Sequence, residues 1–300
     1  MHCERFEDGR EFLKVAEDFL DLHDPATNLI LSNAYRLQET PPSFDQPFYL
    51  ALVQQQGAIL LAAVMGYRLP LCVYAADDVP EEAFALVSAD ILDWQSDVRS
   101  PQFSMGFLDE YRGAIDKLVA PERVAHAFAD VWRNQTGILH NPGMHMRLYE
   151  LRNVHQPDSI HGHMRLANAD EEELVARWHM EMAQEAMDSP MSETEARLGA
   201  QSKIAAGRVF LWEADGEAVS MACKTRPTKR GIVLNGVYTP PQYRKRGYAT
   251  ACVAAVSARM LDEGYEFCSL FTDLTNPTSN RIYMNIGYHP VRDYREYPLA

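Results

Sequence analysis

The chain has 300 residues, of which 47% are hydrophobic, and 42 acidic against 28 basic side chains give it a net charge of −14. This composition is typical of a globular protein and excludes a disordered chain. A pI near 5.1 argues against a nucleic-acid partner, because phosphate contacts need clustered Lys and Arg. The length favours two domains over one, since a domain usually holds roughly 100–200 residues.

The sequence contains no membrane or export signal of the common kinds. Its longest apolar stretches, such as residues 58–65, fall far short of the roughly 20 residues that span a bilayer. The charged N-terminus does not resemble a signal peptide. An odd number of widely spaced cysteines favours reduced thiols over disulfides or a zinc site; they are Cys3, Cys72, Cys223, Cys252 and Cys268. We therefore predict a cytoplasmic protein without a metal or a membrane partner.

In the first half, helical periodicity runs from Gly9 to Leu22, and a second helix is predicted after Asp24-Pro25, with Asp as its cap and Pro in its first turn. Three closely spaced apolar segments then predict an antiparallel meander at residues 48–54, 58–65 and 71–75. The remaining predicted elements are a helix over 78–94, a strand around Gln102–Leu108, a helix over 121–134 and a strand over 145–151.

A polar stretch with Pro and Gly at residues 154–162 is predicted to be a linker, which divides the chain into domains 1–153 and 163–300. In the second half, Ser192 and Glu195 form a capping-box pattern, and Asp215-Gly216 predicts a hairpin turn. Strands are predicted over 163–167, 209–214, 218–225, 232–238 and 267–272, and helices over 168–187, after 192, over 247–263 and over 278–285. Both halves share one order of elements, which reflects either internal duplication or a common α/β order arising by chance.

The segment from Asn235 to Thr250 joins a predicted strand to a predicted helix and contains three consecutive cationic residues, followed by Gly247 and Ala249. A helix start offers unpaired N–H groups and the positive end of the helix dipole, and small residues let a ligand approach the backbone. These features predict a pyrophosphate-binding loop. The alternative is that residues 244–246 are only a solvated helix cap.

The pattern Arg244-x-x-Gly247-x-Ala249 between a strand and a helix resembles the acetyl-coenzyme A loop of the GNAT superfamily of N-acetyltransferases. Downstream, residues 276–288 resemble the helix of that family that carries spaced Asn residues, a Tyr and a closing Gly-Tyr. The resemblance covers residues 163–299, whereas the first half lacks a basic glycine-bearing loop. The whole chain resembles bacterial proteins in which a degenerate GNAT-like domain precedes an intact one. The implied fold class is α/β, with tandem domains built on a mixed, mostly antiparallel sheet flanked by helices.

The resemblance also implies a set of site residues. The strands on either side of the loop and its helix would separate at their carboxyl ends and hold the pantetheine arm of acetyl-coenzyme A along Val237, Tyr238 and Thr239. Tyr283 would be the general acid, with Asn276 and Asn280 near the thiol; the alternative for Tyr283 is a packed core tyrosine. The pyrophosphate would lie on the backbone amides of Arg244, Lys245, Arg246, Gly247, Tyr248, Ala249 and Thr250.

The family's general base is missing from its usual strand, where residues 232–235 are Ile, Val, Leu and Asn. Asp273 is the carboxylate available in the motif region, although a capping role for the following turn is the favoured interpretation, and water could also carry the proton. His179 is either a packed surface histidine or a residue of the acceptor side. The neighbouring histidines His140 with His145 and His161 with His163 lack the i, i+4 helical spacing and nearby carboxylates of a metal site.

We therefore predict an N-acetyltransferase that moves an acetyl group from acetyl-coenzyme A to a primary amine by direct attack in a ternary complex. The acceptor would be a small molecule or a peptide, and the oligomeric state, monomer or dimer, is left open. The charge of about −11 up to Arg152 would attract a cationic acceptor if the first domain faced the cleft. The alternatives are a non-catalytic acyl-coenzyme A sensor and an acyltransferase that uses longer acyl groups.

Overall fold

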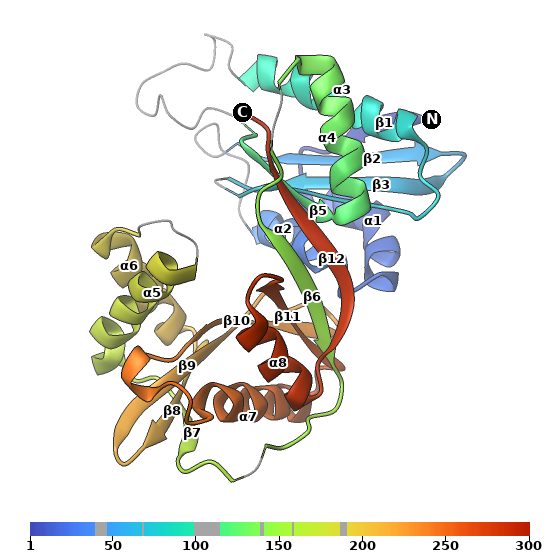
Figure 1. Ribbon diagram of the computed structural model, residues 1–300. Helices are drawn as coiled ribbons and strands as arrows, with labels where there is room; N and C mark the ends of the chain where they lie inside the picture. Colours follow the sequence, from blue (N-terminus) through green and yellow to red (C-terminus); the bar gives the residue numbers. More distant parts are fainter. Residues whose placement is uncertain (40–46, 68, 99–114, 139–140, 158, 187–190) are drawn as a thin grey trace. The chain divides into compact units, whose positions relative to one another are not determined.

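The computed structural model describes residues 1–300 except 40–46, 68, 99–114, 139–140, 158 and 187–190. It divides into two compact units, each a mixed sheet with helices on both faces (Figure 1). Unit 1 comprises residues 1–148, 273–275 and 291–300, and unit 2 comprises residues 149–272 and 276–290. Residues 291–300, which the sequence analysis assigns to the second domain, therefore pack with the first unit.

Unit 1 contains the predicted meander, extended by three further strands. The strand order is β1-β2-β3-β4-β5-β12, in which β1 to β4 are antiparallel neighbours and β4 and β5 are parallel. The strands are β1 (His2–Arg5), β2 (Tyr49–Gln55), β3 (Ala58–Met65), β4 (Leu71–Ala75), β5 (Lys117–Pro121) and β12 (His289–Pro298), and β6 (His145–Leu151) begins in this unit. The helices are α1 (Gly9–Leu22), α2 (Asn28–Glu39), α3 (Glu81–Val98) and α4 (Glu122–Thr136).

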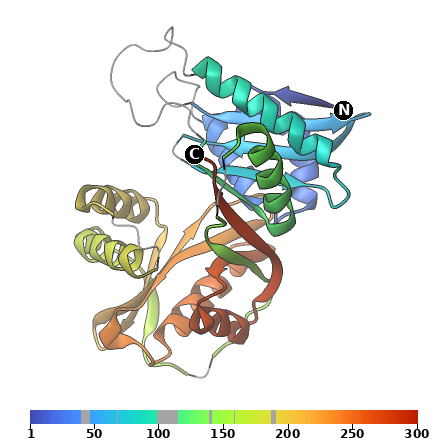
Figure 2. The same ribbon diagram turned by 45° about the horizontal axis from the view of Figure 1, so that its top comes forward.

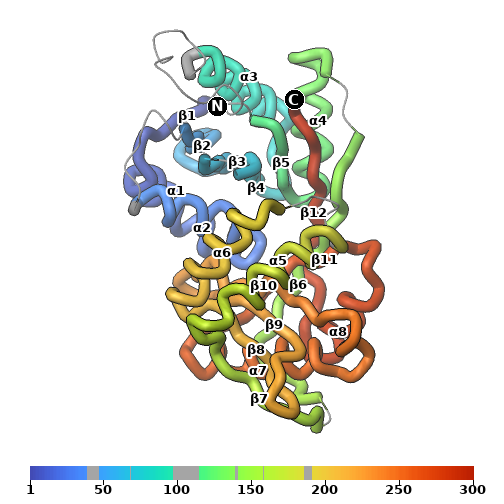
Figure 3. Tube along the Cα trace, turned by 90° about the vertical axis from the view of Figure 1, so that its left-hand side faces the viewer, coloured from blue at the N-terminus to red at the C-terminus, as the bar shows by residue number. Residues whose placement is uncertain are grey.

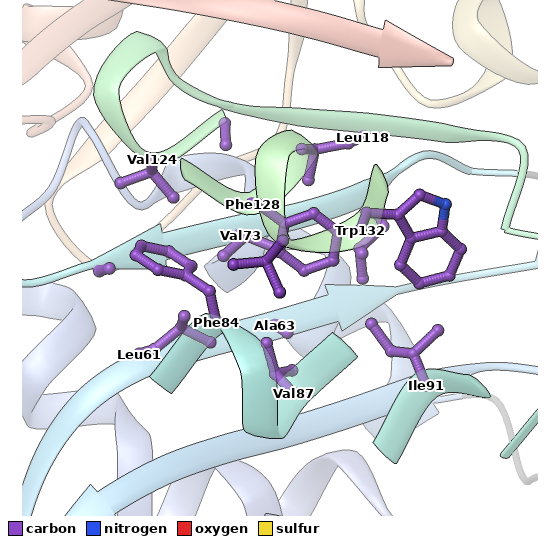
Figure 4. Packing of buried hydrophobic residues seen from close by; sticks show 14 of the residues in the cluster. Leu61, Ala63, Val73, Phe84, Val87, Ile91, Leu118, Val124, Phe128 and Trp132 are labelled. Carbon is purple, nitrogen blue, oxygen red and sulfur yellow. The ribbon is translucent and has the colours of Figure 1, made fainter. Parts of the chain in front are cut away.

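Alternation along β3 and β4 sends successive side chains to opposite faces of this sheet, and each face has its own core. One face packs against α1 and α2 and the other against α3 and α4 (Figure 3). Figure 4 shows the second core, in which Phe84 of α3 and Phe128 of α4 lie over Leu61, Ala63 and Val73.

Unit 2 repeats the same plan, with β6 (from Tyr149), β11, β10, β9, β8 and β7 in that order across the sheet. Its strands are β7 (His163–Leu166), β8 (Val209–Ala214), β9 (Glu217–Thr225), β10 (Gly231–Tyr238) and β11 (Phe267–Asp273). Its helices are α5 (Glu172–Ala186), α6 (Glu193–Ala205), α7 (Tyr248–Asp262) and α8 (Pro277–Ile286). Helices α5 and α6 pack on one face and α7 and α8 on the other (Figure 2).

Several local predictions are confirmed. The Ser192 hydroxyl accepts from the Glu195 amide at 3.3 Å, and the Glu195 carboxylate accepts from the Ser192 amide at 3.1 Å, which completes the capping box. Asp215 and Gly216 both have positive φ, 52° and 79°, as a two-residue hairpin turn requires. All five cysteines are free thiols.

Other predictions differ from the structure. Pro25 does not lie in the first turn of the second helix, because α2 begins at Asn28, and the strands β1, β5 and β12 were not expected. The strand predicted at Gln102–Leu108 lies outside the described residues. With these strands, both halves run β-α-α-β-β-β-α-β-α-β. No helix within the described ranges is long and apolar enough to cross a membrane.

Candidate functional site

The centre of the candidate site is the place where the parallel strands β10 and β11 part. They pair only at their beginnings, where Gly231, Ile232 and Val233 lie opposite Phe267, Cys268 and Ser269. Beyond these pairs, β10 continues to Tyr238 and β11 to Asp273 without pairing to each other (Figure 1). The separation at the carboxyl ends is the arrangement that the resemblance implies for the strands holding pantetheine.

A β-bulge shapes the free end of β10. Its register against β9 shifts between Asn235 and Tyr238, and Gly236 has a left-handed φ of +59°. A Cβ on Gly236 would lie 3.2 Å from the Cys223 sulfur, so glycine satisfies both the backbone and the space. A bulge takes its extra residue out of the ladder. Backbone groups next to Val237 are thereby removed from regular pairing at the position where a ligand arm would run.

The loop after β10 turns sharply into α7. Pro241–Tyr243 form one turn of 3₁₀ helix, and Lys245 and Gly247 then have positive φ of 63° and 82°. The Arg244 amide donates to Pro241 at 3.3 Å, so the predicted run of free amides begins at Lys245. Among the described residues, the amides of Lys245 through Thr250 have no hydrogen-bond partner. Such a run of N–H groups at a helix start favours an anion.

The three cationic side chains of the loop do not share one role. Lys245 and Arg246 are exposed and form no ion pair within the described parts of the chain. Arg244 instead turns towards α5, where its Nη2 donates to Glu185 at 2.6 Å, while its Nε donates to the Thr239 carbonyl at 2.8 Å. Glu185 lies 59 residues away from Arg244, and no local pattern in the sequence links the two.

The end of β10 also contacts α5 through Tyr238. The Tyr238 hydroxyl donates to Glu181 at 3.0 Å and to Glu185 at 3.3 Å. Burial, followed by these hydrogen bonds, raises the pKa of the Tyr238 phenol well above its usual value. Glu181 and Glu185 are one helical turn apart, which puts both on the same face of α5. The spacing of the two glutamates in the sequence indicates that they share one face of a helix, but it does not show which strand that face contacts.

Tyr283 is buried in the second turn of α8, with 8% of its surface exposed. The centroid of its ring lies 6.5 Å from the ring centroid of Tyr149 and 5.9 Å from that of Tyr288. Burial raises the pKa of Tyr283 to about 12. Its hydroxyl has no hydrogen-bond partner within the part of the chain that the structure describes, and the raised pKa keeps the group protonated at neutral pH.

Asn276, which caps α8, and Asn280 within the helix are both engaged with protein groups. The Asn276 side chain caps the helix by accepting from the Ser279 amide at 3.1 Å. Asn280 accepts from the Tyr149 hydroxyl at 2.9 Å and donates to the Asn276 carbonyl at 2.7 Å. Asp273 accepts from the Thr275 amide at 2.7 Å and from its hydroxyl at 2.8 Å, which is the turn-capping role favoured from the sequence.

His179 is not a surface histidine, because only 3% of its surface is exposed. It lies on α5 behind the bulge, with Cε1 3.5 Å from the point that a Cβ on Gly236 would occupy. Burial, and then the nearby Lys203 charge, lowers its pKa to about 4. The ring is therefore neutral at physiological pH and hydrogen-bonds to Lys203 at 3.2 Å.

The equivalent loop of unit 1 has the opposite charge. Strands β4 and β5 are also parallel, but the residues leading into α3 include Asp77 and Asp78, followed by Glu81 and Glu82 in the first turn. Carboxylates at a helix start repel a phosphate. Unit 1 therefore has no anion-binding loop at this position.

The expectation that His145 lacks nearby carboxylates is wrong, because the fold brings Glu122 and Asp293 to it, with their ligand atoms within 4.8 Å of one another. Arg147 donates to both Asp293 oxygens, at 2.6 and 2.8 Å, and Arg295 donates to Glu122 at 3.2 Å. Each carboxylate thus has a guanidinium partner, and the group forms an ion-pair network in unit 1.

Comparisons with known proteins agree with this geometry. Residues 166–288 match the family model described as the acetyltransferase (GNAT) family. No curated protein sequence matches the chain.

Solved structures match the chain over nearly its whole length. A GNAT-family acetyltransferase from Colwellia psychrerythraea aligns with a TM-score of 0.58 at 10% identity, covering 99% of both chains. A GCN5-related N-acetyltransferase from Sphaerobacter thermophilus gives 0.62 at 14% identity, covering 99% of this chain and 95% of that one. A tandem GNAT protein from the clavulanic acid biosynthesis pathway gives 0.57 at 11% identity, covering 100% and 98%. The chain therefore has a tandem GNAT fold, and its residues 166–288 match the GNAT family model.

Proposed function

We propose that unit 2 binds acetyl-coenzyme A and transfers its acetyl group to a primary amine by direct attack in a ternary complex. The observation that carries the proposal is the run of partnerless amides from Lys245 to Thr250, placed at the end of two strands that part. The residues fit the coenzyme, because glycines at positions 236 and 247 allow the left-handed backbone turns beside the unpaired amides. The bound coenzyme would supply the activated acetyl thioester.

The chain's own residues would bind the coenzyme and donate a proton. The loop amides, with Lys245 and Arg246, would hold the pyrophosphate, and the backbone around Val237 would hold the arm beside β10. The Tyr283 phenol, which stays protonated, would donate its proton towards the departing sulfur. Binding of the donor and the amine in one ternary complex would lower the entropic part of the barrier.

Proton removal from the amine is assigned to Glu181. Glu181 accepts a hydrogen bond from the hydroxyl of Tyr238, which places its carboxylate at the carboxyl end of β10. Within the described residues, Glu181 forms no ion pair with a cation. Glu185 is a weaker candidate, because Arg244 neutralises it. A carboxylate from α5 would thus replace the one absent from β10.

The test is thermal unfolding with and without acetyl-coenzyme A, because a ligand that binds the native state raises its stability. We expect a higher melting temperature in the wild type and a smaller increase in Lys245→Glu/Arg246→Glu, whose side chains are exposed and make no ion pair in the described structure. No increase in the wild type would contradict the proposal.

Release of the coenzyme thiol with a panel of primary amines separates transfer from binding alone. Thiol release that depends on an amine supports acetyl transfer. Binding without release from any amine would favour the non-catalytic sensor, and faster release from longer acyl thioesters would favour the alternative acyl donor.

A further inference from the structure

We propose that Arg244 does not bind the coenzyme but positions the pyrophosphate loop by joining it to Glu185 on α5. This inference rests on the proposed function, because it concerns how the same loop is held. It changes the role of the first residue of the basic triplet from a phosphate ligand to a positioning residue.

The Arg244 side chain makes three contacts. Its Nε donates to the Thr239 carbonyl at 2.8 Å, its Nη2 donates to Glu185 at 2.6 Å, and its Cζ lies 5.7 Å from the centre of the Tyr238 ring. Glu185 accepts in turn from the Tyr238 hydroxyl at 3.3 Å. A guanidinium suits this arrangement because its planar fork can donate in two directions while it stacks on a ring.

The backbone explains why neighbouring cations separate. Arg244 is extended, with φ −68° and ψ 160°, and Lys245 then turns into the left-handed region at φ 63°. All three side chains are exposed, but Arg244 reaches back to the end of β10 and pairs with Glu185, whereas Lys245 and Arg246 form no ion pair within the described residues. The strained Lys245 conformation directly follows the fixed residue, at the start of the amide run.

The direction in which Glu185→Gln changes coenzyme affinity distinguishes the two possible roles of Arg244. If Arg244 were a phosphate ligand that Glu185 holds back, Glu185→Gln would free it and remove a negative charge, and both effects would tighten coenzyme binding. If the pair positions the loop, the same substitution loosens the amides and weakens binding. The two roles therefore predict opposite changes.

The experiment is isothermal titration of coenzyme A into the wild type, Glu185→Gln, Arg244→Ala, the double variant and the control Lys245→Ala. We expect Kd to rise about 5-fold to 10-fold in both Glu185→Gln and Arg244→Ala, with no further rise in the double variant, since the two residues form one contact. Lys245→Ala should weaken binding independently, so its effect should multiply with that of Glu185→Gln. Melting temperatures without coenzyme identify any variant that fails to fold, and Arg244→Gln then replaces Arg244→Ala.

An unchanged or lower Kd in Glu185→Gln would overturn the inference while leaving the proposed function intact. The inference would also be overturned if the increases in Kd caused by Glu185→Gln and Arg244→Ala multiplied in the double variant, because residues that act independently do not share one contact. If the wild type fails to bind coenzyme A at all, the proposed function fails, and this inference fails with it.

Discussion

The Cδ1 methyl of Ile160 lies 2.8 Å from the point where a Cβ on Gly247 would stand. Gly247 is therefore restricted twice, by this neighbour and by its φ of 82°. We expect Gly247→Ala to lower stability by about 1–3 kcal/mol and to reduce coenzyme binding. Urea unfolding of Gly247→Ala with and without Ile160→Ala separates the causes, because the second change relieves the contact and leaves the backbone strain. Wild-type stability in Gly247→Ala would contradict this account.

Removal of the Tyr283 hydroxyl should affect turnover and spare the fold. It makes no hydrogen bond within the described residues, so Tyr283→Phe should keep the melting temperature and the Kd for coenzyme A. Loss of a general acid should lower kcat by roughly 10²-fold to 10⁴-fold. Because the pKa of Tyr283 is raised to about 12, its ionisation should not limit the wild type below about pH 11. Equal kcat in both proteins would remove Tyr283 from the mechanism.

The assignment of Glu181 predicts a different pattern. Glu181→Gln keeps a hydrogen-bond acceptor for Tyr238 and removes the charge, so coenzyme affinity should stay within about 2-fold while kcat/KM for the amine falls by roughly 10²-fold. Steady-state rates over a range of amine concentrations measure this effect. If kcat/KM rises again to the wild-type value at high pH, the missing group is the one that accepts the proton. An unchanged kcat/KM at neutral pH would rule Glu181 out.

His179 should make stability depend on pH on the acid side. Burial lowers its pKa to about 4, below the ordinary value of about 6.5, so between these values the unfolded chain binds a proton that the folded chain does not. The contribution of the neutral His179 to stability is therefore fully present above pH 6.5. It decreases by roughly 3 kcal/mol as the pH falls towards 4. Urea unfolding from pH 7 to pH 4 should show a smaller decrease in His179→Gln, which still offers Lys203 an acceptor. Equal decreases in the two proteins would contradict this origin.

The sequence predicts best what depends on neighbours along the chain. Ser192 with Glu195, and Asp215 with Gly216, fix a helix start and a turn within four residues, and both form as expected. The start of α7 also lies where the sequence predicts it, directly after Gly247. Local sterics and capping decide such features.

Features that depend on distant partners were missed. Pro121 ends β5 and precedes α4 directly, so the short apolar run before it has no turn signal to mark it as a strand. Strand β12 is rich in charged and aromatic residues and becomes regular by pairing with β5, where Tyr294 lies opposite Pro121. The partner of Arg244 was missed for the same reason, because no local pattern shows that α5 reaches the end of β10.

The place of β12 has a consequence for how the protein is made. Residues 294–298 pair with β5 of unit 1, and Tyr297 joins the core of that unit, although they follow all of unit 2 in the sequence. During translation the first half emerges first, yet the edge of β5 stays open until these late residues leave the ribosome. The linker is therefore not a boundary at which the chain divides into two complete units. A gene fragment ending there encodes a first unit with an unpaired strand edge, and the fragment that follows carries the strand that belongs on that edge.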